Sequence, residues 1–168
     1  MLTPDEIITA LGMRALPTEG GYFVESYRSV ENLTEGALPD SFGAPRSLAT
    51  AIYYLLTPGT FSAMHRLRSD EVYHFYLGDP VEMLNLYPGG EARTITLGSD
   101  LLRGTHLQAV VPRDVWQGSR LVSGGKYALM GTTMAPGFDP ADYEHGKRED
   151  LLRSFPEARG LITALTRE

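Results

Sequence analysis

The 168-residue sequence has no cysteine, only two lysines and no long hydrophobic run. Without thiols, the chain has no disulfide framework, no thiolate metal site and no cysteine nucleophile. Its longest apolar stretch, residues 49–56, is interrupted by Thr50 and is far shorter than the ~20 residues that a membrane helix needs. The N-terminus has neither the basic start nor the apolar core of a signal peptide. These absences predict a cytoplasmic protein that does not contact a membrane.

Positive charge is also sparse and is not clustered. Thirteen of the 15 basic residues are arginines scattered along the chain, and 21 acidic residues leave a net charge of −6. Proteins that follow a phosphate backbone need a basic patch or run. Nucleic acid is therefore not expected as a partner.

Glycine and proline are abundant, with 18 and 11 copies, and they recur about every ten residues. Short runs rich in Tyr, Val, Ile, Leu and Thr lie between them. This spacing is typical of an antiparallel all-β sandwich or barrel, and the length suits a single domain, residues 1–168. Strands are expected near 22–28, 46–56, 61–67, 71–77, 81–87, 92–97, 106–111, 115–122 and 126–134.

Short helices are expected only at the two ends. Residues Thr3-Pro4-Asp5-Glu6 form a capping box with Pro in the first turn, and Gly12 ends the apolar stripe that follows. A second capping box is expected at 154–157, ahead of another apolar stripe. Both stripes predict helices that cover a sheet face. The polar segment 31–45 is expected to be a loop, and the sequence leaves open whether it is a lid or a disordered insertion.

The residues best suited to chemistry lie between Pro58 and Gly78. A tight turn starts a strand that ends at His65, and the next strand starts at Glu71, so a hairpin would place an imidazole beside a carboxylate. Alternation puts Glu71, Tyr73 and Phe75 on one face and Val72, His74 and Tyr76 on the other. Because both faces carry aromatic rings, we expect the outer one to be covered as well, which predicts a homodimer formed through a sheet face.

These residues match a known motif. Gly59, His65, Glu71 and Gly78 have the spacing of the first cupin motif, G-x5-H-x-H-x3–4-E-x6-G. The second cupin motif is best matched at 111–117. Together with the stretches 19–22, 64–66, 70–71 and 115–117, the sequence resembles the DUF985 or Cupin_5 branch of the cupin superfamily. This resemblance implies a double-stranded β-helix, the cupin jelly-roll barrel, which is usually a homodimer and has no settled activity.

The departures from the cupin motifs concern the metal ligands. Metal-bearing cupins hold their ion with three histidines and a glutamate. Here Leu67 replaces the second histidine, Gln117 stands in place of the third, and Asp114 replaces a motif glycine. An alkyl group supplies no ligand, and a neutral amide is a poor one for divalent first-row ions. The sequence therefore predicts no metal and no cofactor, and a pocket whose floor is His65, Glu71 and Gln117.

Two functions fit such a pocket. In a metal-independent isomerase or epimerase, His65 would be the base, oriented by Glu71, and Tyr73, Tyr53 or Tyr54 would be the acid. In a non-catalytic module, the same barrel would bind a small polar or aromatic ligand. The ligand-binding residues expected in either case are His65, Glu71, Phe75, Gln117 and Tyr53.

Several alternatives remain open at this point. One is a metal-dependent enzyme that uses an incomplete ligand set, and another is a structural scaffold with a vestigial pocket. His65 and Glu71 are also compatible with a hydrogen bond to each other that only satisfies buried polar groups. Three arginines, at positions 46, 66 and 113, are candidates to reach the mouth of the pocket.

Overall fold

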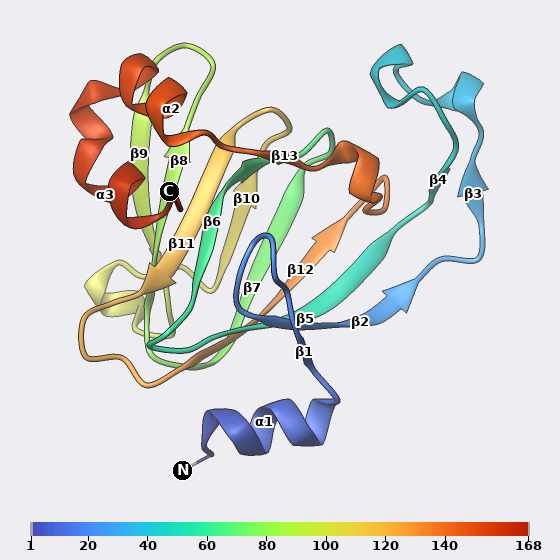
Figure 1. Ribbon diagram of the computed structural model, residues 1–168. Coiled ribbons are helices and arrows are strands. Elements are labelled where there is room, and N and C mark those ends of the chain that lie inside the picture. Colours follow the sequence, from blue (N-terminus) through green and yellow to red (C-terminus); the bar gives the residue numbers. More distant parts are fainter. Residues whose placement is uncertain (1, 168) are drawn as a thin grey trace.

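The computed structural model describes residues 2–167, which form two facing antiparallel β-sheets (Figure 1). The first sheet has the order β1-β2-β5-β12-β7-β10 and consists of β1 (Arg14–Ala15), β2 (Tyr22–Arg28), β5 (Thr50–Leu56), β12 (Ala128–Met134), β7 (Glu71–Gly78) and β10 (Gln108–Val111). The second has the order β13-β6-β11-β8-β9 and consists of β13 (Glu144–His145), β6 (Phe61–Arg66), β11 (Trp116–Leu121), β8 (Val81–Leu86) and β9 (Ala92–Leu97). The expected all-β jelly roll is confirmed.

The strands lie close to where the turn spacing puts them. The expected strand 46–56 is divided into β4 (Arg46–Ser47) and β5, and the start of β10 is two residues later than expected. Three strands of two residues each were not predicted: β1, β3 (Asn32–Leu33) and β13. Such strands are too short to show a periodicity. β1 pairs with the next strand, β2, whereas β3 and β13 pair with strands 13 or more residues away in the chain.

The first helix is as predicted. In α1 (Pro4–Leu11), the hydroxyl of Thr3 accepts from the amide of Glu6, the carboxylate of Glu6 accepts from the amide of Thr3, and Gly12 adopts the left-handed conformation at the C-cap. Its buried Ile7 packs with Leu55 and Leu129 on the outside of the first sheet.

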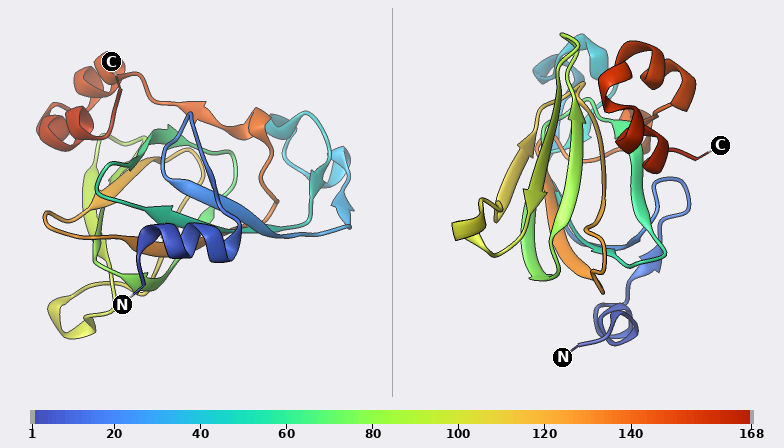
Figure 2. Two further views of the ribbon diagram at one scale, coloured as in Figure 1. Left: turned by 60° about the horizontal axis from the view of Figure 1, so that its bottom comes forward. Right: turned by 90° about the vertical axis from the view of Figure 1, so that its left-hand side faces the viewer.

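The second predicted capping box is wrong. Helix α2 (Arg148–Ser154) ends where that cap was placed, and a 3-10 turn, η5 (Pro156–Ala158), leads into α3 (Arg159–Ala164). No side chain caps η5 or α3. Even so, α2 and α3 cover the outer face of the second sheet, as expected (Figure 2). No helix within residues 2–167 is long and apolar enough to cross a membrane.

The main core lies between the two sheets. Its buried members from the first sheet are Tyr54, Leu56, Tyr73, Phe75, Ala128 and Met130, and those from the second include Val81, Met83, Leu97 and Leu121. The alternation predicted for β7 is confirmed, because Glu71, Tyr73 and Phe75 are buried and the intervening residues are not.

The polar segment 31–45 forms an ordered arm. It contains β3, which pairs with β4, and two 3-10 turns, η1 (Glu35–Ala37) and η2 (Asp40–Phe42), and it projects to one side of the barrel (Figure 1). At its base, the buried guanidinium of Arg46 donates from Nε and Nη2 to the carboxylate of Asp142, both at 2.7 Å. Asp142 ends another 3-10 turn, η4 (Pro140–Asp142). One further turn, η3 (Leu101–Arg103), leads from β9 to β10.

Candidate functional site

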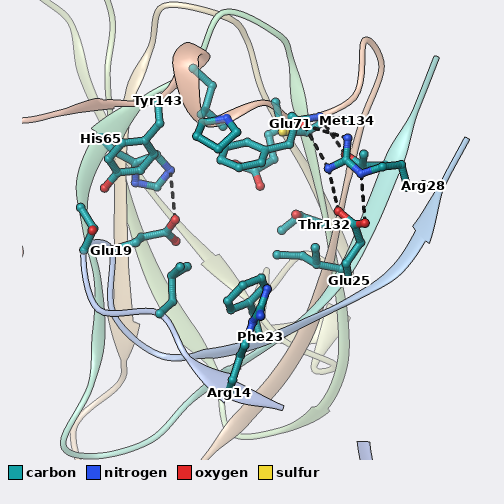
Figure 3. Close-up of a pocket in the computed structure, with 17 residues that line it drawn as sticks. Arg14, Glu19, Phe23, Glu25, Arg28, His65, Glu71, Thr132, Met134 and Tyr143 are labelled. Carbon is teal, nitrogen blue, oxygen red and sulfur yellow. Dashed lines mark hydrogen bonds and ion pairs between the residues drawn. The ribbon is translucent and has the colours of Figure 1, made fainter. Parts of the chain in front are cut away.

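One end of the barrel contains a cavity of about 550 Å3 (Figure 3). Charged and hydrogen-bonding side chains lie among a mainly apolar lining, which is the usual composition of a small-molecule site. The lining residues are Arg14, Leu16, Thr18, Glu19, Phe23, Glu25, Arg28, Thr50, Ile52, His65, Leu67, Glu71, Thr132, Met134, Phe138, Pro140 and Tyr143. None of them belongs to the arm, so the structure does not show the arm as a lid.

His65 is held so that one particular ring nitrogen is available. Its Nδ1 lies 2.8 Å from the carbonyl oxygen of Ala63. Because a carbonyl only accepts, Nδ1 carries a proton and Nε2 is the nitrogen that changes protonation state. Nε2 faces a carboxylate oxygen of Glu19 at 4.0 Å, and the ring stacks on that of Tyr143, with 5.1 Å between centroids. His65 can therefore exchange a proton through Nε2.

Glu19 is a site residue that the sequence reasoning did not select. It lies in the turn between β1 and β2, where Ser62 Oγ donates to its carboxylate at 2.8 Å and its carbonyl accepts from the amide of Ala63. The next residue, Gly20, has a φ of 108°, and a Cβ there would overlap the carbonyl of Phe61. The pair Gly20-Gly21 lets this turn lie directly against β6, and was the available signal.

Glu71 is buried in the floor of the cavity and has several hydrogen-bond donors. Gln117 Nε2 donates to its carboxylate at 2.9 Å, and the hydroxyl of Thr132 also donates to it. Burial raises the pKa of Glu71, and the nearby His65 offsets part of this rise. The alternative in which His65 and Glu71 only bond to each other is not what the structure shows, since His65 pairs with Ala63 and Glu19.

The structure brings together some of the predicted site residues but not all. His65 and Glu71 line the cavity, while Gln117 lies behind Glu71 and does not line it. Tyr73 and Phe75 point into the packed core deeper in the barrel. Tyr53 has the opposite parity to the lining residues of β5 and lies on the outer face, edge-on to Tyr76.

Tyr143 is the tyrosine that lines the cavity. It precedes β13, which pairs with β6 so that His145 lies opposite His65. Burial and the nearby carboxylate of Glu19 raise the pKa of Tyr143, so its hydroxyl stays protonated at neutral pH. No local sequence pattern indicates Tyr143, because its partner in the contact, His65, is 78 residues away in the chain.

The arginines at the mouth are not those expected from the sequence. Arg46 is paired with Asp142, and Arg66 is paired with Glu144 and stacked over Trp116. Arg113 does not line the cavity either. Arg14 and Arg28 do, and both come from the strands that form one side of the mouth.

The donor set does not fit the metal of three-histidine cupins. Leu67 lines the cavity at the position of the second histidine, and it is an apolar wall. The amide nitrogen of Gln117 is directed at Glu71. Within residues 2–167, no group of three or more His, Cys, Asp or Glu side chains is arranged to hold a metal ion. We therefore derive no step through a metal.

Comparison with known proteins places the chain in a family. Residues 5–146 match Cupin_5, a family of the cupin superfamily also named DUF985. The chain belongs to the Cupin_5 family. A relative of this Cupin_5 protein, the uncharacterized protein YML079W of Saccharomyces cerevisiae, is 31% identical over 143 residues, which are 80% of this chain and 71% of the yeast protein.

Solved structures resemble the chain over nearly its whole length. The crystal structure of protein SO0799 from Shewanella oneidensis has a TM-score of 0.86 and 33% identity, over 99% of both chains. A hypothetical protein from Leishmania major has a TM-score of 0.88 and 28% identity, over 99% of this chain and 100% of that one. Oxalate decarboxylase from Bacillus subtilis matches at a TM-score of 0.53 and 14% identity, over 91% of this chain and 37% of its own, which is a likeness of fold alone.

Proposed function

We propose that this Cupin_5 protein binds a small polar or aromatic metabolite in its barrel, and that His65 exchanges a proton with it, as in a metal-independent isomerase or epimerase. The observation that supports this most is the hydrogen bond from His65 Nδ1 to Ala63, which leaves Nε2 as the nitrogen that changes protonation state in the lining of an apolar cavity. A histidine suits the role of general base when one ring nitrogen is fixed by a hydrogen bond and the other is available to take a proton.

The surrounding groups suit proton transfer beside a carbonyl. Nε2 would take a proton from the carbon next to a carbonyl, and the imidazolium formed would lie beside the carboxylate of Glu19. Tyr143 is a protonated donor on the same cavity wall, able to hydrogen-bond the oxygen on which charge develops. Return of the same proton from His65 to a neighbouring carbon gives the isomer without net gain or loss of protons. For an epimer, water delivers a proton to the original carbon from the opposite face while His65 releases its proton to solvent, and the protons again balance.

The alternative is a binding module without turnover. Glu71 favours it, because Gln117 and Thr132 already donate to its carboxylate and reduce its freedom to act as an acid or base. In this function, His65 and Tyr143 only orient the ligand, and the apolar lining supplies most of the affinity.

One experiment separates the two functions. Native mass spectrometry of the purified protein identifies a ligand that it retains, and that compound is then incubated in D2O with wild-type protein or His65→Ala. For an isomerase, proton NMR shows loss of the signal of the carbon-bound hydrogen with wild type only. Retention without exchange supports the binding module. Exchange at equal rates with both proteins contradicts the role of His65.

We also propose that the protein is a homodimer that uses the outer face of the first sheet. This face carries Tyr76, Val110 and Tyr53, and the Tyr76 ring lies against Gly131, where a Cβ would overlap it. Tyr76 and Val110 are about half exposed, which leaves an apolar patch uncovered. Light scattering at micromolar concentration should give twice the chain mass, and Tyr76→Lys should give monomers. A monomeric wild type refutes the proposal.

A further inference from the structure

The mouth of the cavity presents an arginine that is held in place by a ring. Arg14 lies on β1 directly opposite Phe23 of β2, so both side chains are on the same face of the sheet. The guanidinium carbon is 4.9 Å from the centre of the Phe23 ring, and both residues line the cavity. Stacking on an aromatic face limits how far the long side chain swings away.

Arg14 has no acidic partner among residues 2–167. The other arginine of the mouth, Arg28, donates to both carboxylate oxygens of Glu25, at 3.0 and 2.7 Å, and also to the carbonyl of Phe138. The charge of Arg28 is thereby paired with that of Glu25, and four of its five N–H donors are used. In a chain with a net charge of −6, Arg14 is left as the cation of this cavity that is able to form a two-pronged contact with a carboxylate.

Apart from the Arg28–Glu25 ion pair, two separate groups of polar residues line the cavity. Figure 3 shows Arg14 and Phe23 on one side and His65 with Tyr143 on the opposite side. The rest of the lining is mainly apolar and includes Leu16, Ile52, Leu67 and Met134. On the side of His65, the carboxylates of Glu19 and Glu71 repel an anion. A ligand with one negative end therefore has only one favourable orientation.

We propose that the ligand is a small organic acid whose carboxylate binds Arg14, whose middle is apolar or aromatic, and whose hydroxyl or carbonyl group meets His65. This inference rests on the proposed function, since it names the class of molecule that the same cavity takes. Arg14 determines that class, and His65 carries out the proton exchange.

A matched pair of probes tests the charge requirement. 3-Phenyllactate has a carboxylate, an aromatic ring and a hydroxyl group, and 3-phenyllactamide is its uncharged counterpart. Calorimetric titration at low salt should show that wild type binds the acid about tenfold more tightly than the amide, the size of a single charge-assisted contact. Arg14→Gln should lower the affinity for the acid to that for the amide, and it should leave the affinity for the amide unchanged. Arg14→Lys should retain part of the preference.

A control variant is available in the same chain. Arg93 also stacks on an aromatic ring, that of Tyr87 at 5.0 Å, but it does not line the cavity. Arg93→Gln should therefore bind both probes like wild type. Circular dichroism of each variant shows that the fold is retained.

The two proposals fail in different ways. Equal binding of acid and amide by wild type, an unchanged acid affinity in Arg14→Gln, or no binding of the acid by wild type each overturns the assignment of an organic acid to Arg14. A different outcome is that the affinity for the acid still depends on Arg14, but His65→Ala and wild type bind the acid equally tightly. In that case the role of His65 in the proposed function is wrong and the Arg14 site stands.

Discussion

The two ends of the barrel are built from the same strands but differ in content. At the packed end, Val81, Met83 and Leu97 from one sheet meet Leu56 and Met130 from the other, and all five are fully buried. At the cavity end, the inward positions are occupied by groups such as His65, Glu71 and Glu19. Apolar packing explains the first end completely, whereas the second end has polar groups that packing does not need.

Strand β7 shows this difference within one element. Its first inward residue, Glu71, lies at the cavity, and the next two, Tyr73 and Phe75, belong to the core. Burying a carboxyl group costs free energy unless donors surround it, and Gln117 supplies one from β11. A group that opposes folding in this way is best explained by what it does for a ligand. We therefore assign the stability of the protein to the packed end and its proposed function to the cavity end.

The largest effect on stability is expected at the packed end. Leu97→Ala removes a side chain with 0% exposure and should lower the free energy of unfolding by about 2–5 kcal/mol. Urea denaturation measures this loss. A loss well under 1 kcal/mol would show that the packed end does not carry the stability assigned to it.

A gain of metal binding should result from two changes at the cavity end. Leu67 lines the cavity beside His65, and Gln117 lies opposite His65 in the strand register. The double variant Leu67→His, Gln117→His restores three imidazoles beside Glu71 and should bind Ni2+ or Zn2+ about a hundredfold more tightly than wild type.

Calorimetry with each ion measures the difference, and elemental analysis after dialysis gives the ions retained per chain. Wild type should retain far less than one transition ion. Stoichiometric metal in wild type would contradict our interpretation of the donor set.

A smaller effect on stability is expected from the charge of Glu71. Its native pKa is raised, so the native state binds this proton more tightly than the unfolded chain does, and stability falls as pH rises through the native pKa. Glu71→Gln removes this dependence. Its melting temperature should exceed that of wild type by a few degrees at about pH 8, and the difference should shrink toward about pH 5. A difference that grows as pH falls would mean that the carboxylate form is the stabilised one.

Much of the fold could be predicted because local sequence patterns determine it. Glycine and proline mark the turns, and alternation along β7 shows which residues face the core. The C-terminal helices were placed less well, since Pro156 and the residues around it suit a capping box but form a 3-10 turn instead. Asp114 stands where the second cupin motif has a glycine, and its φ of 65° lies in the left-handed region. Aspartate tolerates this backbone conformation better than most residues other than glycine.

The site could be predicted only in part. The motif spacing identified His65 and Glu71, but the hairpin expected to join them is wrong: β6 pairs with β11 and β13, β7 pairs with β10 and β12, and the two strands lie in opposite sheets. Glu19 and Tyr143 reach His65 through contacts between residues far apart in the chain, which no local pattern shows. Tyr53 was a reasonable candidate until the parity of β5 was known, and its ring lies outside. Arg14 follows a glycine and a methionine after the first helix, with no motif to indicate that it lines a cavity.

The most direct test combines the two ends in one measurement, the melting temperature with and without saturating 3-phenyllactate for wild type, His65→Ala and Leu97→Ala. Without ligand, Leu97→Ala should melt well below wild type. His65→Ala should lose only about 1–2 kcal/mol, because Gln117 still donates to Glu71. With ligand, wild type and Leu97→Ala should be stabilised and His65→Ala should not. If His65→Ala instead loses about 3–5 kcal/mol, as expected for a broken buried pair, or is stabilised by the ligand like wild type, the role assigned to His65 is contradicted.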